Sequence, residues 1–155
     1  MPHTRTRTLE DAVEGLRFPM VTTSDLTSRP LTCVRAHDQH LWFLVDKTAD
    51  WMKRIAIDPT VGLSFADPKS SDFVSVVGRA EAVHDREVLE RLWNPAAEAW
   101  FNGVDDPKLA ALRVDVEQGQ YWDGPDSRIA RTLAFARARA TGNTEAMGEA
   151  GDVHP

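Results

Sequence analysis

The chain has 155 residues, of which 42% are apolar and 27% charged, and its formal net charge is −6. This length can bury a core within one domain, and the composition is that of a globular chain rather than a disordered one. The excess of acid argues against a general role in binding nucleic acid or an anionic membrane. With Cys33 as the single cysteine, an intrachain disulfide and a clustered thiolate metal site are both excluded.

We expect a protein that is neither exported nor inserted into a membrane. Residues 1–7 lack the apolar run of a signal peptide, and no stretch approaches the run of about 18 apolar residues that spans a membrane. We therefore expect a cytoplasmic protein without a membrane partner. We expect one domain over residues 1–143 and a flexible tail over 144–155, where the composition is too polar to bury much surface.

The first third of the chain predicts a helix followed by strands. Thr8 can cap a short amphipathic helix, because Leu9, Ala12, Val13 and Leu16 follow at helical spacing. Three strand-like runs come next, at 18–23, 30–36 and 40–45. Their short connections indicate antiparallel pairing.

The rest of the chain alternates helices and strands. A helix is expected over 48–57, with Thr48 as its candidate cap and Asp58 and Pro59 as its end. The further expected elements are strands at 61–66 and 73–84, a helix capped by Asp85, a helix starting at Pro95, a final strand at 109–116 and a helix at 128–139. About six strands with inserted helices predict an α+β fold, either a small barrel or a sandwich.

Several common site motifs are missing. The glycines form neither GxGxxG nor GxxxxGK, so the Rossmann and P-loop classes are not expected. The histidines lack a paired spacing such as HExxH, and we predict no metal site. Cys33, inside an apolar strand, is interpreted as a small packing residue rather than a nucleophile.

An ordered series of short strings carries a family resemblance. The strings are Ser28-Arg29-Pro30-Leu31, Leu41-Trp42-Phe43, Asp58-Pro59, Leu63-Ser64-Phe65-Ala66-Asp67-Pro68-Lys69, Val74-Ser75-Val76, Leu92-Trp93-Asn94-Pro95, Ala99-Trp100-Phe101, Asp105-Asp106-Pro107 and Tyr121-Trp122-Asp123. Over about residues 9–142 the chain resembles the pyridoxamine 5'-phosphate oxidase-related family, and within it the general stress protein branch. The resemblance implies a mainly antiparallel split β-barrel with helices at the N-terminus, between strands and at the C-terminus. It also implies a homodimer whose two subunits build two flavin sites.

The resemblance implies flavin mononucleotide (FMN) as cofactor, with FAD or no cofactor as alternatives. Arg29, followed by Pro30, lies on the strand that lines the flavin in the family and offers a cation to its phosphate; the alternative is a surface arginine in a turn. Leu31, Leu44 and Val45 fall where family strands place backbone groups near the isoalloxazine edge. As apolar strand residues, these three could equally belong to the core.

The expected helix start suits a phosphate for a reason independent of the family. Thr48 and Ala49 precede or begin that helix, and free backbone N–H groups at a helix N-terminus attract anions. The family usually offers Thr, Ser and Lys where this chain has Val45, Ala49 and Trp51, so two hydroxyls and a cation are replaced. Trp122 matches a family tryptophan that reaches the flavin from the partner subunit; its alternative role is packing in the interface.

The sequence is compatible with three functions. The first is an FMN-dependent oxidoreductase that acts on an unknown small substrate or on a nicotinamide cofactor, since flavin itself carries hydride and electrons. The second is a flavin-binding general stress protein without turnover. The third is a split-barrel scaffold that has lost the cofactor. The catalytic residues are unknown, and oxidation of pyridoxamine phosphate is not expected, because the C-terminal basic substrate motif of those enzymes is missing.

Overall fold

The computed structural model describes residues 7–124 and 149–154. Its helices are α1 (Leu9–Val13), α2 (Asp50–Ile57), α3 (Arg86–Leu92) and the 3-10 helix η1 (Pro95–Ala99). Its strands are β1 (Arg7–Thr8), β2 (Met20–Thr22), β3 (Ser28–Pro30), β4 (Cys33–His37), β5 (His40–Asp46), β6 (Thr60–Asp67), β7 (Asp72–Val83), β8 (Leu109–Asp123) and β9 (Glu149–His154). The α+β class is confirmed.

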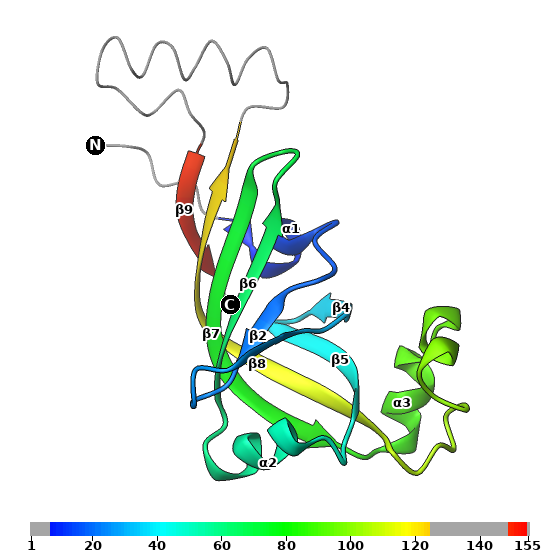
Figure 1. Cartoon of the computed structure of the whole chain (residues 1–155). Coiled ribbons are helices and arrows are strands. Elements are labelled where there is room, and N and C mark those ends of the chain that lie inside the picture. Colours follow the sequence, from blue (N-terminus) through cyan, green and yellow to red (C-terminus); the bar gives the residue numbers. More distant parts are fainter. Residues whose placement is uncertain (1–6, 125–148, 155) are drawn as a thin grey trace, which may run out of the picture.

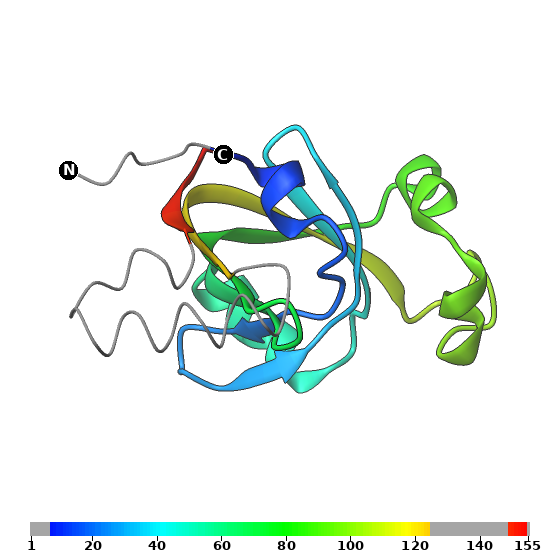
Figure 2. The same ribbon diagram turned by 90° about the horizontal axis from the view of Figure 1, so that it is seen from above.

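All described strands belong to one curled sheet (Figures 1 and 2). Its order is β1-β9-β8-β7-β6-β2-β3, and β5 pairs with both β8 and β4. The long strand β8 pairs with two different strands along one of its edges. Residues 109–115 pair with β5, and residues 119–123 pair with β9. Among the described pairs all are antiparallel except β1 with β9.

The two outer strands β3 and β4 are neighbours in sequence but stand at opposite ends of the path β3-β2-β6-β7-β8-β5-β4. Because a two-residue link joins them, the sheet must curl until these edges meet. The Leu31 N–H donates to Pro19 O at 3.1 Å, and the Cys33 N–H donates to Arg17 O at 2.7 Å. We refer to this region, residues 29–33 with the facing end of β5 and the start of α2, as the seam.

The core fills the inside of the curl. Along β5, Leu41, Phe43 and Val45 point inward and are at most 3% exposed, while the residues between them point outward. From α2, Met52 and Ile55 close one end of this core. A smaller apolar cluster on the outer face holds Leu89 and Leu92 of α3 against β8 (Figure 1). Burial of such side chains stabilises the fold by about 1.5–3 kcal/mol each.

Two strand predictions need correction. The expected strand 30–36 is two strands, β3 and β4, because the chain crosses the seam between Pro30 and Cys33 and changes partner from β2 to β5. The expected final strand 109–116 is too short, because β8 continues to Asp123 with an irregularity opposite Val77 and Gly78. At Gly119 an added Cβ would lie 2.9 Å from the Val76 side chain, so a larger residue would be crowded at this position of β8.

Two predicted helix starts have different outcomes. Thr8 caps α1 by accepting the Asp11 N–H at 3.2 Å, as expected. Thr48 does not cap α2: its hydroxyl donates to Asp46 Oδ1 at 2.6 Å, and the N-cap is Ala49, which has no side-chain acceptor.

Two predictions concern the C-terminal part of the chain. The expected flexible tail over 144–155 is wrong for residues 149–154, which form β9 and pair with β8. The helix expected over 128–139 lies outside the described residues.

Candidate functional site

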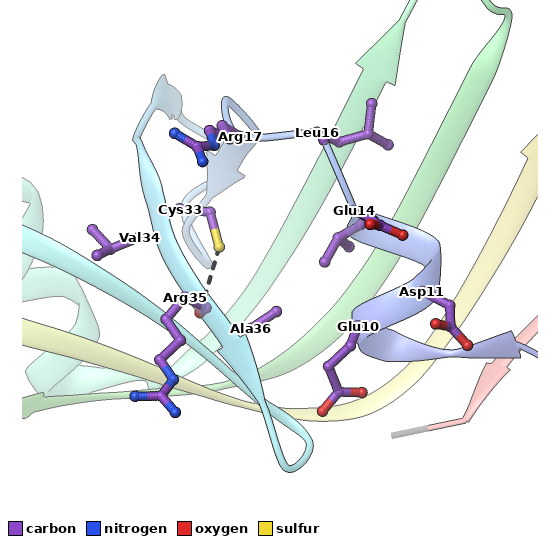
Figure 3. A pocket seen from close by; sticks show the side chains of 11 residues that line it. Glu10, Asp11, Glu14, Leu16, Arg17, Cys33, Val34, Arg35 and Ala36 are labelled. Atoms are coloured by element: carbon purple, nitrogen blue, oxygen red, sulfur yellow. Dashed lines mark hydrogen bonds between the residues drawn. The ribbon is translucent and has the colours of Figure 1, made fainter.

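One hollow in the described part of the chain is a groove of about 410 Å³ between α1 and β4 (Figure 3). The carboxylates of Glu10, Asp11 and Glu14 line its α1 side, and Arg17 and Arg35 lie opposite. None of the residues predicted to bind the cofactor lines this groove. The hollow therefore does not coincide with the predicted site.

The groove contains the one thiol of the chain, Cys33, but it is not a nucleophile. Cys33 is 9% exposed, and its Sγ donates to Arg35 O at 3.7 Å. Burial raises the pKa of the Cys33 thiol to about 11. Because the thiolate is the reactive form, the residue stays inert near neutral pH, which agrees with its interpretation as a packing residue.

At the seam, two of the predicted cofactor residues come into direct contact. The Arg29 guanidinium on β3 lies over the Trp51 ring of α2, with 5.0 Å between Cζ and the ring centroid. Pro30 is exposed beside Arg29, and Leu31 packs partly against the main core. An arginine on an aromatic face keeps its N–H edges open while gaining a cation–π attraction.

Arg29 is held by the β2–β3 turn rather than extended into solvent. Its Nη1 donates to Val21 O at 3.3 Å and to Thr23 Oγ1 at 3.1 Å, and its Nη2 donates to Thr27 Oγ1 at 2.7 Å. Burial lowers the pKa of the Arg29 guanidinium, while the charge of Asp25 opposes that shift, and a guanidinium remains charged at any physiological pH. The seam thus holds a fixed positive charge.

The start of α2 supplies further donors next to this charge. Within the described residues, the N–H groups of Asp50 and Trp51 have no acceptor, since Ala49 offers no side-chain cap. Such free N–H groups carry the positive end of the helix dipole. The Asp50 carboxylate stands nearby but is 96% exposed and pairs with Lys53 at 3.1 Å.

Leu44 and Val45 occupy opposite faces of β5. Val45 is 3% exposed in the main core, and Leu44 packs in the outer cluster under α3. Both are therefore packing residues through their side chains. Pairing of β5 with β4 ends at Phe43, so the strand edge at 44–46 on that side faces the seam without a partner strand in the described chain.

Trp122 lies away from the seam of its own chain. It forms a cross-strand pair with Phe73 on the outer face of the sheet, where the two side chains are 43% and 42% exposed. Both line a small pocket of about 220 Å³ that also borders α1. The chain thus separates Trp122 from Arg29 and Trp51.

The sequence reasoning missed the polar residues that hold Arg29, namely Thr23, Asp25 and Thr27. Thr23 is 2% exposed, which is rare for a hydroxyl residue, and Leu26 at the turn tip adopts a φ of 66°. A left-handed conformation costs a non-glycine residue roughly 1–2 kcal/mol, so the hydrogen bonds around it must maintain the turn. In the sequence, Thr and Asp alternate in this segment, and that pattern by itself indicates only a turn.

The described residues form neither a membrane-spanning helix nor a cluster of metal ligands. No helix there has the length and apolar content needed to cross a membrane. No group of at least three His, Cys, Asp or Glu side chains converges in the way that a metal ion requires.

The curled antiparallel sheet, with one edge of β8 shared between two partners, defines a split β-barrel. The chain resembles a solved structure from Jannaschia sp. CCS1 named for general stress protein 26, with a TM-score of 0.75, 25% identity and 94% coverage of both chains. It also resembles the general stress FMN/FAD binding protein of Xanthomonas citri, with a TM-score of 0.66, 28% identity and coverage of 75% of this chain and 86% of that one. These likenesses confirm the predicted fold.

Comparison of the sequence with known proteins identifies two relatives and a family. Protein bli-3 of Neurospora crassa is 24% identical over 153 residues, which cover 88% of this chain and 73% of that protein. General stress protein 26 of Bacillus subtilis is 36% identical over 45 residues, covering 29% and 32% of the two chains. Residues 4–146 match the family described as pyridoxamine 5'-phosphate oxidase like. The chain belongs to this family.

Proposed function

We propose that this protein binds FMN at the seam, with the phosphate held by Arg29 and the first turn of α2. The observation that carries the proposal is the arrangement of Arg29, whose guanidinium is fixed against Trp51 beside a helix start without a side-chain cap. Family membership and the likeness to an FMN/FAD binding protein support the same conclusion.

The residues present fit the phosphate end of such a cofactor. A phosphate needs charge and several N–H donors, and the seam offers the guanidinium of Arg29 together with the N–H groups of Asp50 and Trp51. The hydroxyls and the cation that the family usually offers at positions 45, 49 and 51 are missing. Backbone donors and one arginine must therefore provide most of the phosphate affinity.

When bound, flavin supplies hydride and electron transfer, so the protein needs no catalytic triad. Its own residues bind the cofactor, orient it and limit the access of water. Asp25 and Arg29 stay charged throughout the neutral range, since the pKa of Asp25 is lowered to about 2 by hydrogen bonds from Thr23 and Thr27. We infer an oxidoreductase of the cytoplasm that acts on a small organic substrate or a nicotinamide cofactor, without these two groups as proton donors or acceptors.

We also propose that two copies of the chain form a homodimer. Trp100 is 83% exposed, and Trp122 and Phe73 lie half-exposed on the outer face of the sheet. A second copy covering that face would bury the latter two and bring Trp122 to the partner's flavin, as the family resemblance implies. Sedimentation at micromolar concentration should report about twice 17.3 kDa. A monomer in the presence of saturating FMN would contradict the shared site.

The absorption spectrum of the purified protein tests the proposal. We expect flavin bands, release of FMN on denaturation as identified by mass, and bleaching on addition of a reduced nicotinamide cofactor. Bands without bleaching by any reductant of that class would favour a flavin-binding stress protein without turnover. A colourless protein that takes up no FMN would contradict flavin binding altogether.

A further inference from the structure

A chain of hydrogen bonds connects Asp25 to Arg29 through two threonine hydroxyls. Asp25 Oδ1 accepts from Thr23 Oγ1 at 2.7 Å, from Thr27 Oγ1 at 2.8 Å and from the Thr27 N–H at 3.3 Å. Those hydroxyls in turn accept from the guanidinium at 3.1 and 2.7 Å. In the described chain Asp25 and Arg29 form no direct ion pair, so the hydroxyls transmit the interaction.

Each hydroxyl makes its shortest contact with an acceptor at Asp25, since Thr23 Oγ1 lies further away, at 3.3 Å, from both Thr27 O and Thr27 Oγ1. A hydroxyl has one proton, and when that proton is donated to Asp25 the lone pairs are left to face Arg29. Hydrogen bonds to an ionised group are stronger than neutral ones and polarise the next bond in the chain. Asp25 is ionised near neutral pH, because hydrogen bonds from Thr23 and Thr27 lower its pKa to about 2.

The two hydroxyls occupy one end of the guanidinium and leave the other open. Their oxygens lie 3.3 Å apart, a spacing that suits the parallel N–H bonds of Nη1 and Nη2. The remaining fork consists of Nε–H and the second Nη2–H, and within the described residues neither has an acceptor. A fork of two parallel N–H donors matches two oxygens of a phosphate.

Helix α2 holds the network from a second direction. Arg29 Cζ lies over the Trp51 ring, 5.0 Å from its centroid, and one turn later Arg54 Nε lies 3.8 Å from Asp25 Oδ2. The β2–β3 turn and α2 are therefore joined at both Arg29 and Asp25. Helix α2 is also the element whose first N–H groups, those of Asp50 and Trp51, have no acceptor within the described residues.

We propose that Asp25 is the positioning residue of the phosphate site: through the Thr23 and Thr27 hydroxyls it fixes Arg29 so that the Nε and Nη2 fork is presented to a phosphate. Asp25 does not touch the ligand, because its interactions reach Arg29 at the opposite, Nη1 and Nη2, end. This inference rests on the proposed function for the identity of the ligand as a flavin phosphate. The placement of Arg29 stands on the hydrogen bonds alone.

The test uses variants that change charge or hydroxyl while keeping shape. Asp25→Asn removes the charge, Thr27→Val removes a hydroxyl, and Thr27→Ser restores it. Asp67→Asn is the matched control, since Asp67 also closes a hairpin turn, accepting the Lys69 N–H at 2.9 Å, but lies away from Arg29. Thermal unfolding of each variant verifies that it is folded.

The first readout is the Arg29 Nε–H signal in nuclear magnetic resonance, followed as inorganic phosphate is added. In the wild type, Thr27→Ser and Asp67→Asn, we expect a signal that is shifted by the Trp51 ring and moves with phosphate. In Asp25→Asn and Thr27→Val the signal should lose its ring shift, and half-saturation should need about ten-fold more phosphate. An unchanged signal in Asp25→Asn, or equal phosphate binding in all variants, would overturn the proposal.

The second readout separates this inference from the proposed function. Titration with FMN and riboflavin should show an approximately ten-fold loss for FMN in Asp25→Asn and no loss for riboflavin. If inorganic phosphate behaves as expected but FMN does not bind to any variant, the positioning of Arg29 stands and the flavin assignment fails. If FMN binds equally to wild type and Asp25→Asn, flavin binding stands and the positioning role fails.

Discussion

The seam and the groove between α1 and β4 both present arginines to solvent, but they hold them differently. In the groove of about 410 Å³, Arg17 and Arg35 are lining residues, and within the described chain neither side chain makes a hydrogen bond or ion pair. At the seam, Arg29 is bound by two hydroxyls and a carbonyl and lies on Trp51. The arginines of the groove thus have no hydrogen-bond partner within the described chain, whereas the arginine of the seam has three.

This difference matters for binding, because ordering a long side chain at the moment of binding costs about 0.5–1.5 kcal/mol. A guanidinium that the fold already orders avoids most of that cost, and its donors point in one direction. The volume of a hollow, taken alone, would make the groove the candidate binding site. The organisation of polar groups favours the seam.

The largest effect is expected for Arg29→Lys, which keeps the charge but removes the planar fork. FMN affinity should fall by about ten-fold or more, since a charge-assisted hydrogen bond contributes about 1.5–3 kcal/mol, while riboflavin, without a phosphate, should bind as before. Fluorescence quenching of both ligands measures this. Arg35→Lys in the groove is the control, and it should change neither affinity. Equal losses of FMN affinity in the two variants would mean that the seam and the groove do not differ in binding the phosphate.

A smaller effect is expected for Trp51→Leu, which removes the ring beneath the guanidinium. The cation–π contact contributes about 0.5–1 kcal/mol at a partly exposed position, so FMN affinity should fall about two- to five-fold. Isothermal titration with FMN and riboflavin gives the comparison. A larger loss for riboflavin than for FMN would instead place Trp51 against the flavin ring and away from the phosphate.

Ala49→Ser adds the side-chain cap that α2 lacks. A serine at the N-cap typically stabilises a helix by about 1 kcal/mol relative to alanine, and the unfolding free energy of the ligand-free protein should rise by that order. Urea denaturation measures the change. Thr48→Ala serves as control, because the Thr48 hydroxyl is engaged with Asp46 and does not cap the helix. Thr48→Ala should lose only the hydrogen bond to Asp46, whereas an unchanged unfolding free energy in Ala49→Ser would contradict a helix start without a cap.

The smallest effect is expected in the groove, at Cys33. Because burial raises the pKa of this thiol to about 11 from the usual 9.0, the folded protein should not react with a thiol reagent at pH 8. The folded state binds this proton more tightly than the unfolded state, so the resulting stability is present below pH 9 and is lost as pH rises through about 11. Cys33→Ala should flatten that part of the stability curve. Rapid modification of native protein at pH 8 would show an accessible thiol.

Local sequence signals predicted most of the elements. Thr8 and Asp85 were identified as caps because each has an oxygen positioned for the next free N–H groups. Long-range effects explain the failures. Nothing local reveals that the chain crosses the seam after Pro30, because this depends on which strands meet when the sheet curls. Residues 149–154 looked too polar for a strand, yet β8 offers them an unpaired edge.

The candidate site was predictable in part. Arg29 and Trp51 were singled out from the resemblance, and the structure brings them into contact. Asp25 was missed because its role depends on the hydroxyls of Thr23 and Thr27, which face Arg29 only once the β2–β3 turn has formed. Turn-forming residues are common in loops, and their sequence does not distinguish a simple turn from one that fixes an arginine.

A crystal structure of the protein with FMN tests the central claim most directly. The account predicts phosphate oxygens within hydrogen-bond distance of Arg29 Nε and Nη2 and of the N–H groups of Asp50 and Trp51. The Thr23 and Thr27 contacts to the guanidinium should be kept. A phosphate bound elsewhere, for example to Arg17 and Arg35 in the groove beside α1, would contradict the account.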